Sequence, residues 1–168
     1  MSRYNDLEFN HLIKSIINNQ EYQKTKSICH HGITRYNHSM RVAYYTYKIT
    51  KFLHLDYEDS TKAALLHDFF TDEVSNKNMV ARLRQHPNCA VKNATKYFNL
   101  NEKQIDIIKT HMFPVTFTPP KYLESWIVDI VDDVAAIYEQ SSTLTTKFNT
   151  ATTFLFIFVV NVLKTKLW

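Results

Sequence analysis

Residues 36–54 read YNHSMRVAYYTYKITKFLH, and this stretch decides the fold class. Its apolar side chains recur at intervals of three or four residues, at Val42, Tyr45, Ile49 and Phe52. This spacing is typical of one face of an α-helix, whereas a half-buried strand would alternate at every second residue. His38 lies four residues before Val42, so we expect it on the buried face of the same helix. Similar spacing continues through most of the chain.

The composition restricts the fold class further. The chain has 168 residues, the size of one ordinary domain, and it contains a single glycine. This excludes the glycine-rich phosphate loops of Rossmann and P-loop proteins, and it disfavours tight hairpins. With 45% hydrophobic and 21% charged residues, disorder is excluded as well. We therefore predict an all-α fold, a single compact helical bundle of six or seven helices formed by residues 1–168.

Capping residues and prolines predict the helix boundaries. Asp56 is a good N-cap before an acidic first turn, and Asn101 with Gln104 resembles a capping box. Pro87 suits the first position of a helix, which would leave His86 extended at the boundary. We predict six helices, over about residues 6–19, 36–54, 56–69, 87–98, 101–113 and 118–140. The last is expected to be central, because it is apolar around most of its circumference.

Two segments interrupt this pattern. A polar loop is predicted over residues 71–78, followed by a short helical piece to Gln85. Residues 141–168 combine a Thr-rich stretch with the apolar LFIFVVNVL. Their β-branched and aromatic residues favour a strand, but an isolated strand would lack a partner, so a terminal helix packed on the bundle is the preferred prediction. The domain assignment leaves this tail, 141–168, unassigned.

Charge and cysteine content predict the cellular setting. The 20 basic and 16 acidic residues give a net charge of +4, which suits a small anionic substrate. No concentrated basic block is present, so we expect no specific nucleic-acid partner. The longest apolar run, Phe154 to Val160, is far shorter than the roughly 20 residues of a membrane helix, so we expect no membrane partner. Cys29 and Cys89 form no metal or redox motif, and a cytoplasmic location is the expectation. The oligomeric state stays open.

Six potential metal ligands follow one another in an ordered set. A histidine lies on a buried helix face, a His-Asp pair ends a helix, two histidines lie at helix boundaries, and an aspartate lies inside an apolar helix. These residues are His38, His67, Asp68, His86, His111 and Asp132. Each taken alone is typical of an ordinary core or surface position. Together they favour a metal site, because a cation offsets the cost of burying ionised carboxylates.

The segments around these residues resemble the HD-domain metal-dependent phosphohydrolase superfamily, and most closely a bacterial group with the H…HD…H…H…D ligand set. The resemblance covers about residues 32–139, the recognisable core. It is carried by RYNHSMRVA, ALLHDFF, QHPNCAVKNA, DIIKTHMFP, PPKYLES and IVDDVAA. It implies that one ion is held by His38, His67, Asp68 and Asp132. A second ion would be held by Asp68, His86 and His111, with Asp68 bridging.

The resemblance also implies an activity. The enzyme would use a metal-activated water to hydrolyse a phosphomonoester or phosphodiester, and a nucleotide is the expected substrate. His67 and Asp68 would be the catalytic residues. Imidazole and carboxylate donors favour two divalent ions of Fe, Mn, Co or Zn, with Mg as a further choice. Arg35, Lys109 and Lys121 lie near the ligands in the sequence and are candidates for binding the phosphorylated small molecule.

One ligand is assigned by the family pattern against the helical wheel. At 100° per residue, Asp132 lies nearly opposite the apolar stripe of its helix. That stripe consists of Leu123, Ile127, Ile130 and Val134. Asp132 is nevertheless preferred, because Val134 and Ala136 complete the Asp-x-hydrophobic-x-Ala pattern of the family. Asp133 departs from the basic residue often found there.

Other functions stay open at this point. The same six-ligand arrangement resembles that of the mixed-valence diiron oxygenases of the superfamily. The bundle could also be a non-catalytic module that metals stabilise. The general acid is not fixed either: Thr71 stands where some nucleotidases of the superfamily have a Glu, and Asp72 or Glu73 could replace it.

Overall fold

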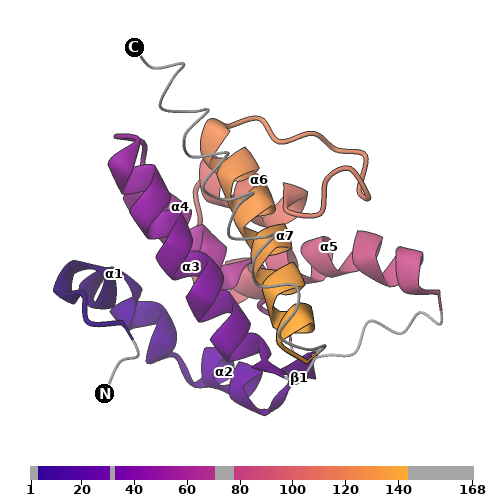
Figure 1. The fold of residues 1–168 in the computed structure, drawn as a ribbon, viewed down its shortest axis with the longest axis horizontal. Coiled ribbons are helices and arrows are strands. Elements are labelled where there is room, and N and C mark those ends of the chain that lie inside the picture. Colours follow the sequence, from indigo (N-terminus) through magenta and orange to yellow (C-terminus); the bar gives the residue numbers. More distant parts are fainter. Residues whose placement is uncertain (1–3, 31–32, 71–77, 144–168) are drawn as a thin grey trace.

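The computed structural model describes residues 4–30, 33–70 and 78–143 (Figure 1). These residues form seven α-helices, one short 3-10 helix and a small hairpin, which confirms the predicted all-α fold. The elements are α1 (Leu7–Ile17), α2 (Gln20–Gln23), η1 (Lys24–Ser27), β1 (Cys29–His30), β2 (Ile33–Thr34), α3 (Arg35–Phe52), α4 (Tyr57–Leu66), α5 (Met79–Tyr97), α6 (Glu102–Thr110) and α7 (Leu123–Thr143). β1 and β2 pair antiparallel, with Cys29 opposite Thr34.

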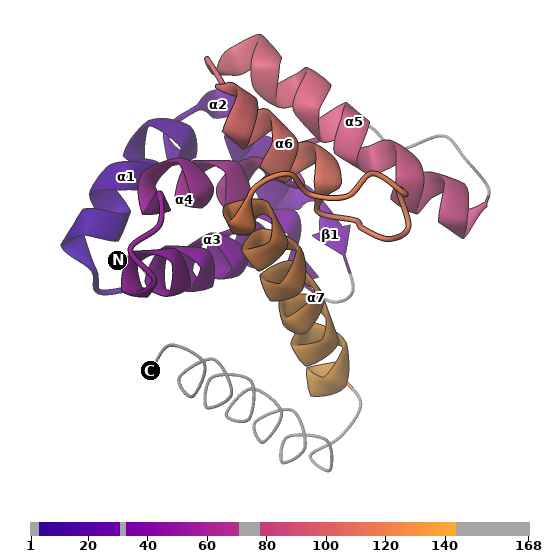
Figure 2. The ribbon, with the colours of Figure 1, turned by 90° about the horizontal axis from the view of Figure 1, so that it is seen from above.

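Helix α4 lies at the middle of the bundle. It packs against α3, with α1 on one side and α6 on another, while α5 covers α6 (Figure 2). Helix α7 packs across α3, α4 and α6. The α3 and α4 helices carry small, fully buried residues, Ala43 on α3 and Ala63 and Ala64 on α4. Small side chains let the two backbones approach closely, which fixes the end of α4 relative to the start of α3.

Local capping confirms most of the predicted helix starts. Asp56 caps α4 by accepting a hydrogen bond from the amide of Asp59 at 3.2 Å. Asn101 and Gln104 form the predicted capping box of α6. The predicted helix 6–19 ends earlier, at Ile17, because the Asn19 side chain caps the separate short helix α2. The hairpin that follows was not predicted.

The prediction that a new helix begins at Pro87 is wrong. Helix α5 continues from Met79 to Tyr97 with Pro87 inside it, and His86 is helical rather than extended. Proline has no amide hydrogen to donate to the carbonyl of Leu83, one turn earlier, and this lost bond ends many helices. Here the packing of Ala90 and Ala94 into the core keeps the helix continuous through the proline.

The predictions about α7 are wrong in two respects. The helix begins at Leu123 rather than at Thr118, because Thr118 and Pro119 each precede a proline and are pushed out of the helical conformation. The helix also presents much of its apolar surface outward: Leu123, Ile130, Val134 and Ile137 are about half exposed. Its buried residues include Glu124, Ser125, Val128, Asp129, Val131, Asp132, Ala135 and Glu139. Helix α7 therefore packs through a largely polar face.

The α3 stripe is also only partly buried. His38 and Val42 are buried as predicted, whereas Tyr45 and Phe52 lie on the exposed side of the helix. The predicted loop 71–78 and the predicted terminal helix in 141–168 fall mainly outside the described residues; residues 141–143 belong to α7. Among the described helices, none is both long and apolar enough to cross a membrane.

A polar cluster holds α4, α6 and the start of α7 together. Lys103 of α6 donates to Asp56 at 3.1 Å and to Glu124 at 3.0 Å, and Glu124 also accepts a bond from the amide of Asp56. Close by, Asp106 accepts bonds from the Lys121 amide and the Ser125 hydroxyl. Since Glu124 is only 7% exposed, its charge depends on these partners.

Replacing Lys103 with Met is therefore expected to lower the free energy of unfolding by about 1–2 kcal/mol, because Glu124 is left without its cation. The matched control is Lys62→Met, which removes the exposed 3.7 Å pair with Glu58 and should cost less than about 0.5 kcal/mol. Urea denaturation at pH 7 measures both variants. Equal midpoints for the two would contradict this role of Lys103.

The pH dependence of Lys103→Met gives a second readout. Burial raises the pKa of Asp56 and Glu124, but backbone amides and Lys103 outweigh it and hold both pKa values below the usual 3.8 and 4.5. Depressed values mean that the stabilisation is complete above about pH 4.5 and is lost as the pH falls through the lowered pKa values. The difference in stability between wild type and Lys103→Met should therefore shrink below that pH.

Candidate metal centre

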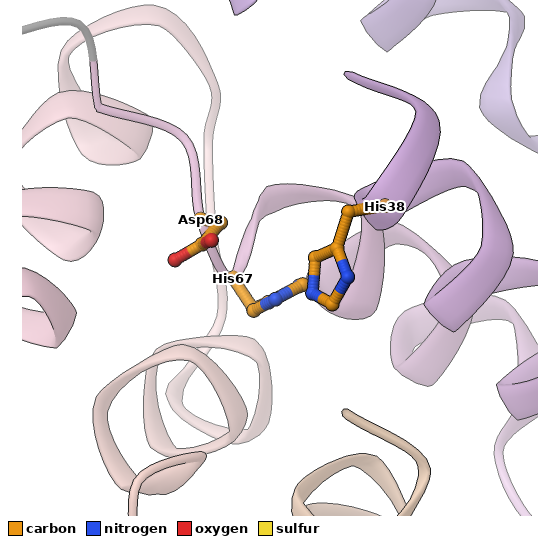
Figure 3. Close-up of side chains that lie close together, drawn as sticks. All are labelled: His38, His67 and Asp68. Carbon is orange, nitrogen blue, oxygen red and sulfur yellow. The ribbon is translucent and has the colours of Figure 1, made fainter. Parts of the chain in front are cut away.

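All six predicted ligands converge where the helices meet. His38 comes from the first turns of α3, His67 and Asp68 from the end of α4, and His86 from the middle of α5. His111 ends α6, and Asp132 lies on the buried face of α7. Figure 3 shows three of these side chains, His38, His67 and Asp68, lying close together. Residues almost 100 positions apart in the sequence thus share one small volume.

Two of the ligands are held by the same local device. His67 follows α4 and His111 follows α6, each as the C-cap residue. Each ring turns back and places Nδ1 2.7 Å from the carbonyl three residues earlier, that of Ala64 or Ile108. Because a carbonyl only accepts, the proton sits on Nδ1. The Nε2 atom of each ring faces the centre. At His67, burial lowers the pKa but the Asp132 carboxylate outweighs it and raises the pKa, so a metal ion at that Nε2 would take the place of a proton.

His38 lies between two carboxylates. Its Nε2 is 2.7 Å from Asp132 Oδ1, and its Nδ1 is 2.8 Å from Glu139 Oε2. Burial lowers the pKa of His38, but Asp132 and Glu139 outweigh it and raise the pKa to about 10. With this pKa the ring is doubly protonated at neutral pH. A metal ion at Nε2 would take the place of that proton.

His86 and His111 face each other through their lone pairs. Their Nε2 atoms are 2.9 Å apart, and each Nδ1 faces a backbone carbonyl, at 3.3 Å for His86 and 2.7 Å for His111. Burial lowers the pKa of both rings. At His111 the neighbouring imidazoles of His86 and His67 add to this effect, and the pKa falls to about 3. Two neutral nitrogens at this distance repel unless a proton or a cation lies between them.

Asp68 and Asp132 supply the negative charge. Asp68 Oδ1 is 3.6 Å from His86 Nε2, and Asp132 Oδ1 is 3.4 Å from His67 Nε2. Burial raises the pKa of Asp68, but the surrounding histidines outweigh it and lower the pKa to about 2. Burial also raises the pKa of Asp132, but His67 and His38 outweigh it and hold the pKa well below its usual value. Both carboxylates are ionised and able to ligate.

The donor atoms form three overlapping groups. Within each group the ligand atoms lie within 4.8 Å of one another, and the groups are His38–His67–Asp68, His67–His111–Asp132 and Asp68–His86–His111. The third group contains the three ligands predicted for the second ion. The first group contains three of the four ligands predicted for the first ion, whereas the fourth, Asp132, falls in the second group. The second group joins the two positions through His67, His111 and Asp132.

Two observations show that these residues fit a cation. The Nε2 atom of His67 is fully buried and makes no hydrogen bond to the described residues, although the Asp132 carboxylate lies 3.4 Å away. Such a group is costly unless a metal or another partner outside the chain completes it. In addition, α4 and α6 both end at the centre, and the negative ends of the helix dipoles favour a positive charge there. With four imidazoles and two carboxylates, the donor set suits Fe, Mn, Co or Zn.

Comparison with known proteins agrees with this geometry. The family model of the HD domain matches residues 35–137, more than half of the chain. The chain is a member of the HD-domain family. All six converging residues lie inside the matched region of this HD domain, and the superfamily consists mostly of metal-dependent phosphohydrolases. No curated protein and no solved structure matches the chain.

The three predicted phosphate-binding residues lie in different surroundings. Arg35 is buried at the start of α3, donates to the carbonyl of Phe70 at 2.7 Å and lies over the Phe70 ring. That ring also lies beside His86. Lys109 and Lys121 are exposed. Arg35 therefore shares a neighbour, Phe70, with the ligand cluster of this HD domain. Asp72 and Glu73 fall outside the described residues.

The sequence pattern did not predict two residues that lie at the site, Glu139 and Arg41. Glu139 accepts a hydrogen bond from His38, and Arg41 forms an ion pair with Glu139. The signal was the spacing of α7: Glu139 follows Asp132 by seven residues, which is two helical turns, so both share a face. Asp129, three residues before Asp132, is also buried; burial, Asp133 and Asp132 raise its pKa to about 7.

Metal binding should stabilise the folded HD domain. Adding Co²⁺ at about one hundred times its dissociation constant to chelator-treated protein is expected to stabilise it by roughly 2.7 kcal/mol per site, seen as a higher melting temperature. His67→Ala should lose most of this increase. His11→Ala, which changes an exposed histidine on α1, should keep it. An unchanged melting temperature in the wild type would contradict metal binding.

Proposed function

We propose that this HD domain is a metal-dependent phosphohydrolase that cleaves a phosphomonoester or phosphodiester of a small molecule, in the first place a nucleotide. The observation that carries the proposal is the convergence of His38, His67, Asp68, His86, His111 and Asp132 around a buried, unsatisfied imidazole nitrogen. The family and the net charge of +4 support it. A cytoplasmic enzyme is consistent with the proposal.

The ligand set divides between two ion positions. His38, His67, Asp68 and Asp132 would hold one divalent ion, and Asp68, His86 and His111 would hold the other. Such ions supply the Lewis acidity that activates water and offsets negative charge on phosphoryl oxygens. The number and identity of the ions are part of the proposal.

The protein's own groups do the remaining work. The depressed pKa of Asp68 keeps it ionised, so it is available as the shared ligand at neutral pH. The carbonyls behind His67 and His111 fix their tautomers and orient Nε2 inward. Their burial excludes water from the ligand atoms and strengthens every charge interaction at the centre. No serine or cysteine nucleophile is needed.

Arg35 is proposed to bind the phosphate of the substrate. Its guanidinium is planar and is held by the Phe70 carbonyl and ring, and such a group can bind phosphate through two parallel hydrogen bonds. The Phe70 ring, which contacts the Arg35 guanidinium, lies 5.7 Å from the His86 ring, and this supports a phosphate site beside the Asp68–His86–His111 group. A phosphoryl group at the ions would thus meet a positive charge on one flank.

The direct test is hydrolysis of a panel of phosphomonoesters and phosphodiesters, nucleotides included, by protein supplied with Mn²⁺, Co²⁺, Fe²⁺, Zn²⁺ or Mg²⁺. The wild type is expected to release phosphate or nucleotide only with metal. His67→Ala and Asp68→Ala should lose at least about a hundredfold in kcat/KM while remaining folded, because the charge stabilisation is gone. His11→Ala is the matched control and should retain full activity.

An intact substrate panel with every metal would contradict the proposal. Iron-dependent consumption of O₂ by anaerobically loaded protein, with a mixed-valence paramagnetic signal, would then assign the HD domain to the diiron oxygenases. Metal-dependent stabilisation without any turnover would assign it to the non-catalytic modules. These three results exclude one another.

Arg35→Lys should raise KM by roughly tenfold with a smaller change in kcat, because lysine keeps the charge but loses the planar fork. Lys109→Gln and Lys121→Gln test the two exposed candidates in the same assay, and each should change KM by less than about twofold. A normal KM in Arg35→Lys, or a larger effect at either lysine, would remove Arg35 from the phosphate site.

A further inference from the structure

The four histidines at the centre differ in what holds them from behind. His67 and His111 direct Nδ1 at backbone carbonyls at 2.7 Å, and His86 directs Nδ1 at the Arg82 carbonyl at 3.3 Å. His38 instead directs Nδ1 at a carboxylate oxygen of Glu139, at 2.8 Å. One of the four imidazoles is therefore backed by a full negative charge.

Glu139 is held in place by a second partner. Its side chain is buried, 5% exposed as a residue, and its other carboxylate oxygen pairs with Arg41. Arg41 is three residues after His38 on α3, so the cation and the imidazole approach Glu139 from the same helix. Glu139 and Asp132 share one face of α7 and contact opposite nitrogens of the His38 ring. The ring position is thereby determined on both edges.

A carboxylate behind an imidazole changes its strength as a ligand. Hydrogen bonding of Nδ1–H to a carboxylate makes Nε2 more basic and fixes the ring orientation, and such outer partners typically contribute about 10–100-fold in metal affinity. A neutral carbonyl does this more weakly, and the 3.3 Å contact of His86 is longer than a good N–H···O bond. The histidines of the two ion positions therefore have hydrogen-bond partners of unequal strength.

We infer that the two ion positions differ in affinity, and that Glu139 is the positioning residue that makes the His38–His67–Asp68–Asp132 position the tighter one. The Asp68–His86–His111 side is then the weaker, exchangeable position. This inference rests on the proposed two-ion centre. It assigns to Glu139 and Arg41 a role in metal retention that is separate from contact with substrate.

The experiment is a Co²⁺ titration of chelator-treated full-length protein. Calorimetry and the visible absorption of bound Co²⁺ both monitor the binding. The wild type is expected to bind in two steps of different affinity. Glu139→Gln keeps an acceptor oxygen but loses the charge, and it should weaken the tighter step about tenfold and leave the weaker step unchanged. Glu139→Ala should weaken the tighter step further, toward a hundredfold.

Glu124→Gln is the matched control. Glu124 is also a buried carboxylate of α7 paired with a base, but its base is Lys103, away from the centre. It should bind Co²⁺ in both steps like the wild type. Circular dichroism of the metal-free variants verifies that each one is folded. His86→Gln provides an independent arm: it should lose the weaker step and keep the tighter one.

The possible results are distinct. Tight binding of the first ion by Glu139→Gln, or an equal weakening of both steps, would overturn the inference. Loss of the tighter step in His86→Gln would overturn it too, even if Glu139→Gln does not fold. A wild type that binds no Co²⁺ would overturn both this inference and the proposed function. Two unequal steps without any phosphohydrolase activity would overturn the proposed function alone.

Discussion

The pairing of Asp132 with His38 is the interaction on which the rest of the centre depends. It joins α7 to α3 across 94 positions of sequence, and both partners are buried. An ionised carboxylate at this depth is tolerated because imidazoles from two helices, His38 and His67, approach it. The pairing holds the polar face of α7 against the bundle, and it does so at the point where α4 and α6 end.

Ordinary apolar packing prepares this arrangement. The small residues between α3 and α4 set the distance of His38 from the end of α4, and Ile107 and Ile108 bury α6 against the same core. Helices α4 and α6 then each stop at a histidine whose ring contacts a carbonyl of the last turn. The ligands of the HD domain are therefore placed by helices and helix ends, which hold a site more precisely than loops do.

Much of the local structure could be predicted because it depends on neighbours in the sequence. The caps at Asp56 and Asn101 are short-range hydrogen bonds, and the helical spacing of apolar residues is a property of each segment. The ligand set was predicted from a family resemblance, and the structure brings its six members together. The continuity of α5 through Pro87 could not be predicted, since it depends on packing against another helix.

Helix α7 shows why the remainder of the site escaped the sequence pattern. A helical wheel assumes that polar side chains face water, so it placed the leucine and isoleucine stripe inward and Asp132 outward. In the structure Lys103, Arg41 and the imidazoles supply partners of opposite charge, and burying Glu124, Asp132 and Glu139 becomes favourable. These acidic residues recur at intervals of seven or eight residues along α7 and share one face of it. A periodic stripe of acidic residues on an otherwise apolar helix thus indicates a buried face when basic residues on other helices pair with it. Which basic residues do so is visible only once the helices are packed together.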